Sequence, residues 1–582
     1  MVTRSRSLLV AASAALVLGA LGSPAHAADG ERETAKVRVS TSTGASLAAA
    51  VSGAAPLQAR PTVVEFTPYG ERGASFSVGE EYNFLTVQIR GTGDSGGAFD
   101  VLGPKTQRDV RDTLAWTCSQ PWSDGRLAVV GFSASAITYF NSQHQELPCV
   151  KAAVMRSGTF ELYRDLLVPG GVPNSVPGLA VLSAIGGLAL VQADQRLSRD
   201  PLSGTETVLG LLGLLGSGLS AGLLNPTLNT YWKERGFRGD ANEVPTLLID
   251  GVFDVEPRGD YQAFQQLQAQ GTPAQLLVVG AHDGAPRGTD HGAAQIDKWL
   301  DRWVLGVQNG VEDEPAVQML VADGGREQFL DGQFLRYDGS SWPLPGTSWT
   351  PLSLSAKRAG TSASPKDGSL TIEPDATTTR QSYAAFTSLP TQVDPHTIST
   401  LGAPLNQLTT WIPFLTDMKL TNLTGLTFTS APLKESVTAI GPGTLDVRLS
   451  TTGVSTPIWA VVSDVWPDGT THPMTVGRLS SAFPGVVEEK SLYSDGNLVQ
   501  PYGDYSNPRL ALPGVARDYH VELWPIANRF KAGHRIQVSL VGQSALSLPS
   551  IPALNTVTIG KGSGSRLMLP TVPESDLAAA LR

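Results

Sequence analysis

Residues 126–136 read RLAVVGFSASA, and this stretch decides the fold. The apolar run up to Gly131 predicts a buried strand, and the small residues that follow allow a sharp turn into a helix. A serine on such a strand–turn–helix junction is a nucleophile elbow, which raises its hydroxyl above the carboxyl edge of the sheet. A G-x-S-x-S run alone is often an ordinary turn, but its place after a buried strand makes Ser133 the candidate nucleophile.

The surrounding chain alternates short apolar runs with helical periodicity from about residue 61 to residue 305. The runs are nearly continuous in apolar residues, which is typical of a parallel sheet covered on both faces. The expected strands are 61–66, 82–89, 126–131, 151–155, 245–249 and 275–280. The expected helices are 107–117, 260–270 and 293–305. This order predicts an α/β layer architecture.

A segment from about residue 161 to residue 243 interrupts the alternation. It contains VLGLLGLLGSGLSAGLL at 208–224, which is too short and too rich in glycine for a membrane span. We expect a helical cap over the active site. Such an apolar cap either receives an acyl chain or another apolar group of the substrate, or packs only on itself or on a partner.

Beyond about residue 316, short β-branched runs separated by turn residues replace the helical pattern. Examples are 444–449, 458–465, 519–524 and 536–541. This spacing predicts an all-β domain, a β-sandwich of the jelly-roll kind. The polar stretch 361–380 is expected to be a long loop. The predicted domains are thus 28–315, with the cap inserted, and 316–582.

The N-terminus predicts export. Residues 1–27 join two arginines, a short apolar core and an Ala-His-Ala end, which together form a secretory signal peptide. We therefore expect a secreted protein, extracellular or in the cell envelope, without an integral membrane span once the signal is removed. The formal net charge of −10 argues against a nucleic-acid partner. Cys118 and Cys149 are either a disulfide or two buried thiols.

An activated serine needs a base and an acid, which follow it in an α/β-hydrolase in the order Ser, Asp, His. The acid should follow the strand 245–249, where Asp254 is better placed than Asp250 to reach over the sheet edge. The base should follow the strand 275–280. We favour His282 there, with His291 as the alternative. His144, which precedes every candidate acid, is expected to be a surface residue. The chemistry requires no metal and no organic cofactor.

Acyl transfer also needs donors for the oxyanion that develops on the carbonyl oxygen. One is expected to be the backbone N–H of Ala134, directly after the nucleophile. Tyr69 follows the first expected core strand, where an oxyanion loop belongs, although a tyrosine there could equally be core packing.

These residues, in this order, resemble a family of serine hydrolases that includes cocaine esterase and the X-prolyl dipeptidyl aminopeptidases. The resemblance runs over nearly the whole chain after the signal. It is carried by PTVVEFTPY at 61–69, RGTGDSGG at 90–97, the block from 116 to 133, WLDRWVLG at 299–306, DVWPDG at 464–469 and LWPIANRFKAGHR at 523–535.

The resemblance implies an α/β-hydrolase domain followed by a jelly roll, with Ser133 as nucleophile, Asp254 as acid, and Tyr69 with Ala134 as oxyanion donors. The chain departs from the family where the elbow has Ala134 and Ala136 in place of a tyrosine and a glycine. It departs again where Gly284 stands at the usual position of the histidine.

We expect an exported carboxylesterase that acts on a small ester or amide, because no acidic pocket for a substrate amine is evident in the sequence. An X-prolyl dipeptidyl peptidase or another amidase is the alternative enzyme. A catalytically silent binding protein on a hydrolase scaffold is the alternative of another class. The sequence does not indicate an oligomeric state.

Overall fold

The computed structural model describes most of the chain after the predicted signal peptide. The described residues are 32–71, 73, 76–173, 224–254, 257–278, 291–323, 333–361, 366–385, 416–542 and 551–582. The predicted signal peptide, most of the predicted cap and His282 lie outside these residues. No helix within the described ranges is both long and apolar enough to cross a membrane.

The first half of the chain builds a ten-stranded sheet in the order β1-β2-β4-β3-β5-β6-β7-β8-β9-β10. Seven of these strands, from β4 to β9, run parallel. The strands are β1 (Arg32–Ser40), β2 (Ser46–Ala54), β3 (Arg60–Thr67), β4 (Asn83–Gln88), β5 (Ser123–Phe132), β6 (Val150–Arg156), β7 (Thr246–Asp250), β8 (Ala274–Val278), β9 (Val317–Ala322) and β10 (Phe334–Gly339). The α/β prediction is confirmed.

Helices cover both faces of this first sheet, which explains the apolar runs of its central strands. Helices α2 (Pro104–Cys118), α3 (Ala134–Phe140) and α7 (Pro257–Ala269) pack on one face with Val129 and Leu248. Helix α8 (His291–Leu300) packs on the other face with Val130 and Ile249. Alternate residues of one strand thus supply two separate cores.

The second half of the chain forms an eleven-stranded sheet, which closes because β23 pairs with both β11 and β15. Its strands are β11 (Ser348–Ser355), β12 (Asp367–Thr371), β13 (Thr379–Ala384), β14 (Leu426–Thr429), β15 (Val437–Thr451), β16 (Pro457–Val465), β17 (Thr471–Ser480), β20 (Arg517–Phe530), β21 (Arg535–Val541), β22 (Leu554–Ile559) and β23 (Arg566–Thr571). A small hairpin, β18 (Leu492–Ser494) with β19 (Asn497–Gln500), stands apart. The expected β-sandwich domain is confirmed.

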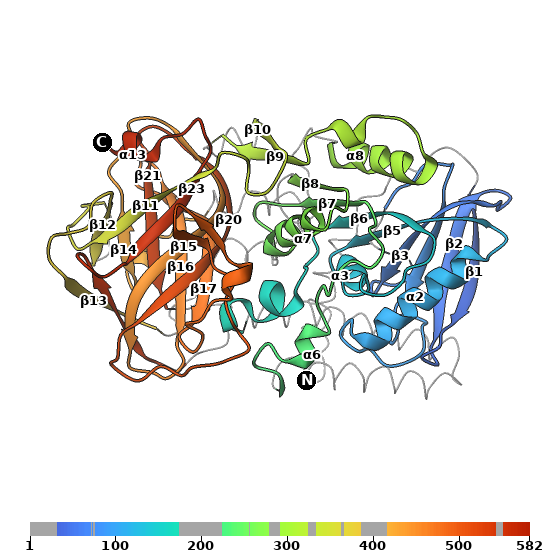
Figure 1. The fold of residues 1–582 in the computed structure, drawn as a ribbon, viewed down its shortest axis with the longest axis horizontal. Helices are drawn as coiled ribbons and strands as arrows, with labels where there is room; N and C mark the ends of the chain where they lie inside the picture. Colours follow the sequence, from blue (N-terminus) through green and yellow to red (C-terminus); the bar gives the residue numbers. More distant parts are fainter. Residues whose placement is uncertain are drawn as a thin grey trace, which may run out of the picture.

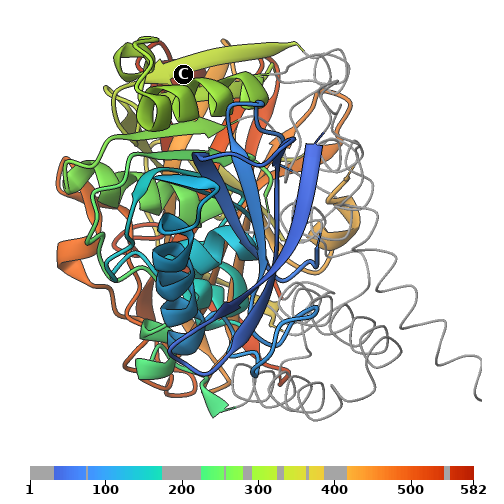
Figure 2. The same ribbon diagram turned by 90° about the vertical axis from the view of Figure 1, so that its right-hand side faces the viewer.

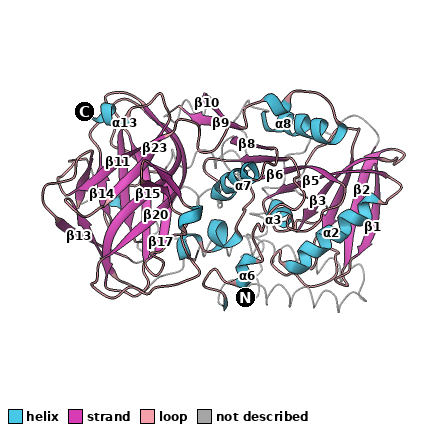
Figure 3. Cartoon of the chain, viewed as in Figure 1, coloured by secondary structure: helices cyan, strands magenta, loops and turns pink. Residues whose placement is uncertain are grey.

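The two sheets form two halves of an elongated molecule, and α7 lies on the side of the first sheet that faces the second (Figure 1). The view from the end that carries β1 and β2 places the second sheet behind the first (Figure 2). Described helices gather in the half with the first sheet, whereas the other half is almost entirely strand (Figure 3). We call the two halves the first and the second domain.

Two features differ from the sequence predictions. The stretch 361–380 is not one long loop, because β12 and the start of β13 fall within it; Leu370 of β12 is buried in the core. The first sheet also continues past residue 315, since β9 pairs with β8 and β10 pairs with β9.

Cys118 and Cys149 form a disulfide with their Cα atoms 6.3 Å apart. It links the last residue of α2 to the residue before β6, and β5 lies between these two elements in the chain. Of the two alternatives left by the sequence, the structure has the disulfide.

Candidate active site

Ser133 stands between β5 and α3 in a backbone conformation that side chains rarely adopt, with φ 51° and ψ −120°. Its N–H donates to the carbonyl of Arg156 at 3.0 Å, and its carbonyl accepts from Ile137 at 3.0 Å. A non-glycine residue is held at positive φ only where its surroundings impose it, and such strain is typical of functional turns. Ser133 is half-buried, while Ala134, Ser135 and Ala136 are fully buried.

The turn closes tightly because small residues surround it. A Cβ added at Gly131 would come within 2.5 Å of the backbone nitrogen of Ala136. A Cβ added at Gly158 would come within 2.7 Å of the Ala136 methyl group. The methyl of Ala136, which replaces the family's glycine, is thus accommodated by a glycine on the loop after β6.

Tyr69 and Ala134, the two expected oxyanion donors, are brought together. The backbone N–H of Ala134 donates to the Tyr69 hydroxyl at 3.2 Å. Tyr69 lies on the loop after β3, which neighbours β5 in the sheet, and is only partly buried. An oxyanion beside Ser133 could therefore accept from a backbone N–H and a phenolic O–H, which is the arrangement that stabilises a tetrahedral intermediate.

The sheet register places the expected nucleophile and acid at one edge. Phe132 is level with Arg156, and Arg156 is level with Ile249 on β7. Asp254 follows β7 by four residues and is completely buried, with its N–H donating to the carbonyl of Gly251 at 3.3 Å. Ligands and catalytic groups of open α/β sheets lie at this carboxyl edge.

Three buried carboxyl groups gather behind that edge: Asp250, Asp254 and Asp260. Burial raises the pKa of Asp250 well above its usual range, and the charges of Asp254 and Asp260 raise it further. A side-chain hydrogen bond joins Asp250 to Asp254. Burial and these neighbouring charges thus favour the protonated form of Asp250.

The structure describes the candidate histidines only in part. His282 lies outside the described residues, four positions after the end of β8. His291 begins α8, and its side chain is not described. His144 is half-buried rather than on the surface. Its Nε2 lies 2.8 Å from the Arg238 guanidinium. The assignment of the base to His282 thus stays a prediction.

The sequence analysis missed Glu65, a fully buried carboxylate on β3 beside the elbow. Its Oε1 accepts a hydrogen bond from the Ser135 hydroxyl at 3.0 Å. Glu65 is the single charged residue of the run PTVVEF, and a lone charge in a central strand is a signal that could have been noticed. It anchors the first turn of α3, which carries the Ala134 N–H.

A metal centre finds no support in the described part of the chain, where no three His, Cys, Asp or Glu side chains gather as metal ligands. The serine at the strained turn, the two expected oxyanion donors and the buried Asp254 lie along one edge of the sheet.

Comparisons with known proteins agree with this chemistry. The family model for X-Pro dipeptidyl-peptidase (S15 family) matches residues 44–283, and the model for the X-Pro dipeptidyl-peptidase C-terminal non-catalytic domain matches residues 309–561. A predicted serine esterase from Mycobacterium bovis is 22% identical over 85% of this chain and 84% of its own. Cocaine esterase from Rhodococcus is 23% identical over 80% of each chain.

A solved structure extends the likeness to the fold. A CocE/NonD family hydrolase from Staphylococcus aureus superposes with a TM-score of 0.71 at 16% identity, covering 95% of this chain and all of its own. The matches to the catalytic and the C-terminal models follow one another along the chain, and both relatives align over at least 80% of each chain. The chain belongs to the X-Pro dipeptidyl-peptidase (S15) family of serine hydrolases.

Proposed function

We propose that this protein is a secreted carboxylesterase that cleaves small esters through an acyl-enzyme. His282 takes the proton of the Ser133 hydroxyl, the serine oxygen attacks the ester carbonyl, and the alcohol leaves with that proton. Water then attacks the acyl-enzyme with His282 again as base, which releases the carboxylic acid and restores Ser133. Asp254 holds the imidazole in the required orientation.

The observation that supports this proposal most is the conjunction at the elbow. Ser133 is held at φ 51°, and the Tyr69 hydroxyl and the Ala134 N–H lie 3.2 Å apart beside it. Backbone strain persists only where the surrounding structure imposes it, and strained residues cluster at active sites. A catalytically silent scaffold would not require a strained serine next to two converging donors. Relatives named for esterase activity support esters over peptides.

Secretion is supported by residues 1–27, with cleavage expected after Ala27. N-terminal sequencing of the protein recovered outside the cell should begin at Ala28. A mature protein that still begins at Met1 would contradict export through a cleaved signal.

The X-Pro dipeptidyl peptidase is the second candidate, because the matching family model carries that description. Hydrolysis of p-nitrophenyl esters of increasing acyl length, run beside alanyl-prolyl-p-nitroanilide, separates the two. We expect ester turnover to exceed anilide turnover, and to be lost in Ser133→Ala and in His282→Ala but retained in His291→Ala. A preference for the anilide would overturn the esterase assignment, and loss in His291→Ala alone would move the base.

A further inference from the structure

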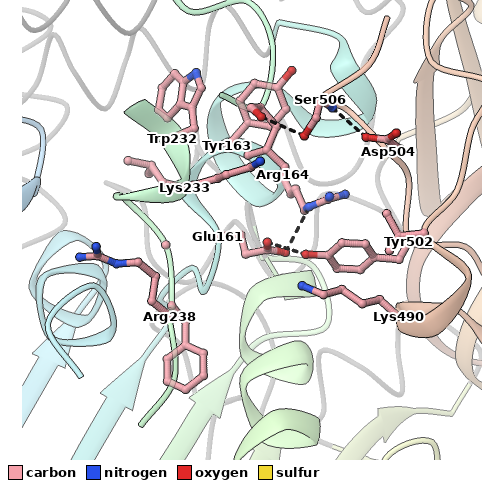
Figure 4. A pocket seen from close by; sticks show the side chains of 15 residues that line it. Glu161, Tyr163, Arg164, Trp232, Lys233, Arg238, Lys490, Tyr502, Asp504 and Ser506 are labelled. Carbon is pink, nitrogen blue, oxygen red and sulfur yellow. Dashed lines mark hydrogen bonds and ion pairs between the residues drawn. The ribbon is translucent and has the colours of Figure 1, made fainter. Parts of the chain in front are cut away.

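A cavity of about 340 Å³ lies between the two domains, and its Glu161 carboxylate is already paired. Glu161 accepts from the Tyr502 hydroxyl at 2.6 Å and lies 3.3 Å from the Arg164 guanidinium (Figure 4). This carboxylate serves the contact between the domains, since Tyr502 belongs to the second domain. A buried carboxylate in a different setting, Glu65, lies beside the proposed nucleophile.

Glu65 lies where β3 meets the elbow. Its Oε1 accepts from the Ser135 hydroxyl at 3.0 Å, and both residues are buried. Ser135 is in the first turn of α3, directly after Ala134, whose N–H is one of the expected oxyanion donors. The hydrogen bond therefore links strand β3 to the turn that presents this donor.

Glu65 also contacts the loop that carries Tyr69, the other expected donor. The loop begins directly after β3, where the Tyr69 N–H donates to the Thr67 hydroxyl at 3.0 Å. It then turns, and the Gly73 N–H donates to the carbonyl of Gly70 at 3.3 Å. A Cβ added at Gly73 would collide with Oε2 of Glu65. One oxygen of Glu65 thus contacts the elbow, and the other lies against the Tyr69 loop.

The two donors differ in how their positions are fixed. Ala134 follows Ser133 directly, and one tightly packed turn holds both. Tyr69 lies on a different element, 65 residues from Ala134 in the chain, with its hydroxyl 3.2 Å from the Ala134 nitrogen. Two donors stabilise one oxyanion only when both are held within about 0.5 Å of the productive geometry. The placement of Tyr69 therefore needs a contact between β3 and α3, and the hydrogen bond from Ser135 to Glu65 is such a contact.

We propose that Glu65 is a positioning residue of the active site. Through its hydrogen bond with Ser135, it holds the Tyr69 loop at the distance from the elbow at which the Tyr69 hydroxyl and the Ala134 N–H reach the same oxyanion. Glu65 touches no reacting atom and transfers no proton. The inference rests on the proposed function, because only a reaction that passes through an oxyanion depends on this placement.

A double-mutant cycle tests this role. The constants kcat and KM are measured with the p-nitrophenyl esters for the wild type, Ser135→Ala, Tyr69→Phe and the double variant. Active sites are counted with a fluorophosphonate probe, so that unfolded protein does not count as a loss of kcat. The matched control is Ser142→Ala, alone and with Tyr69→Phe. The Ser142 hydroxyl is also buried, and it donates to the carbonyl of Thr138 at 2.8 Å, beyond the other end of α3.

We expect Ser135→Ala to lower kcat by at least about tenfold and to change KM by less than about twofold, because the affected interaction is made only in the transition state. In the Tyr69→Phe background the same change should lower kcat by less than about twofold, because no phenolic hydroxyl remains to be placed. Ser142→Ala should change kcat by less than about twofold in both backgrounds. If the Ser135 hydroxyl served the fold alone, its removal would cost the same factor in kcat in both backgrounds.

Equal losses for Ser135→Ala with and without the Tyr69 hydroxyl, no loss in either background, or a change confined to KM would overturn this inference and leave the esterase assignment in place. Ester turnover that is absent from the wild type, or that persists in Ser133→Ala, would instead overturn the proposed function, and this inference with it.

Discussion

Buried charges collect in two regions of this molecule, and they are organised in opposite ways. At the edge of the first sheet, Asp250, Asp254 and Asp260 lie together, and the two neighbours help to raise the pKa of Asp250. At the domain interface, Arg258 lies 2.6 Å from Asp165 and 2.8 Å from Glu522 of the second domain. One region places like charges together and raises the pKa of Asp250, whereas the other pairs opposite charges.

Under the proposed function, the first region belongs to the catalytic site, whereas the second holds the two domains together. Carboxyl groups that push each other's pKa values apart divide into one that keeps its proton and one that stays charged, as acid and base roles require. A buried arginine between carboxylates instead fixes two surfaces in one relative position. Substitutions in the first region should therefore alter catalysis, and substitutions in the second should alter stability.

The largest effect expected from this contrast is between two neighbouring aspartates. Asp254→Asn should lower kcat/KM for a p-nitrophenyl ester by about 10⁴-fold, because a triad histidine without its carboxylate adopts the wrong tautomer. Asp250→Asn should cost less than about tenfold, because an amide donates the same hydrogen bond as the protonated carboxyl. The reverse order of the two losses would show that Asp250 is the acid.

At the interface, Arg258→Met should destabilise the protein by about 3–5 kcal/mol, because it leaves Asp165 and Glu522 buried without their shared cation. Urea unfolding followed by circular dichroism measures this change. The matched control is Arg448→Gln, whose partner Asp518 is exposed; it should cost less than about 1 kcal/mol. Equal losses in both variants would remove the distinction between the two pairs.

A smaller effect is expected where the elbow meets Glu65. Ser135→Ala removes a hydroxyl that donates to this buried carboxylate, and should cost about 1–3 kcal/mol of unfolding free energy. Ser119→Ala, whose exposed hydroxyl donates to the carbonyl of Trp116, should change it by less than about 0.5 kcal/mol. Indistinguishable unfolding midpoints would mean that Glu65 does not depend on Ser135.

The smallest effect lies in the second domain and depends on pH. The hydrogen bond from His520 to Asp446, 2.7 Å long, raises the pKa of the histidine against the effect of burial. Because the folded-state pKa is raised, protonated His520 stabilises the fold fully below its unfolded value of about 6.5, and this stabilisation is lost as pH rises through the folded-state pKa.

His520→Gln should therefore lower the unfolding free energy near pH 5.5 and leave it nearly unchanged near pH 9. Urea titrations of both proteins at the two pH values measure the difference. A loss that is larger at the alkaline pH would contradict the assigned direction.

The sequence predicted what depends on local pattern. The strand that leads to Ser133, the helix after it and the alternation around them follow from residues close together in the chain, and all lie where expected. The pairing of β1 with β2 was missed, although Val37 and Val39 of β1 show the alternation of an amphipathic strand.

The interface could not be predicted in the same way. Arg258 lies 264 residues from Glu522 and 93 from Asp165, so no local periodicity relates them. Asp250 and Asp254 were both visible as candidates, but the raised pKa of Asp250 depends on its burial, on Asp254 and on Asp260, a residue of the next helix.

The central claim is that Ser133 is the activated nucleophile, and covalent labelling tests it most directly. The mature protein is treated with a fluorophosphonate probe, digested, and mapped by mass spectrometry, beside Ser133→Ala and the neighbouring control Ser135→Ala. We predict a single label on Ser133, absent from Ser133→Ala and retained in Ser135→Ala, because only a serine next to a general base and an oxyanion hole reacts. A label on another serine, a label that persists in Ser133→Ala, or an unlabelled wild type would contradict the account.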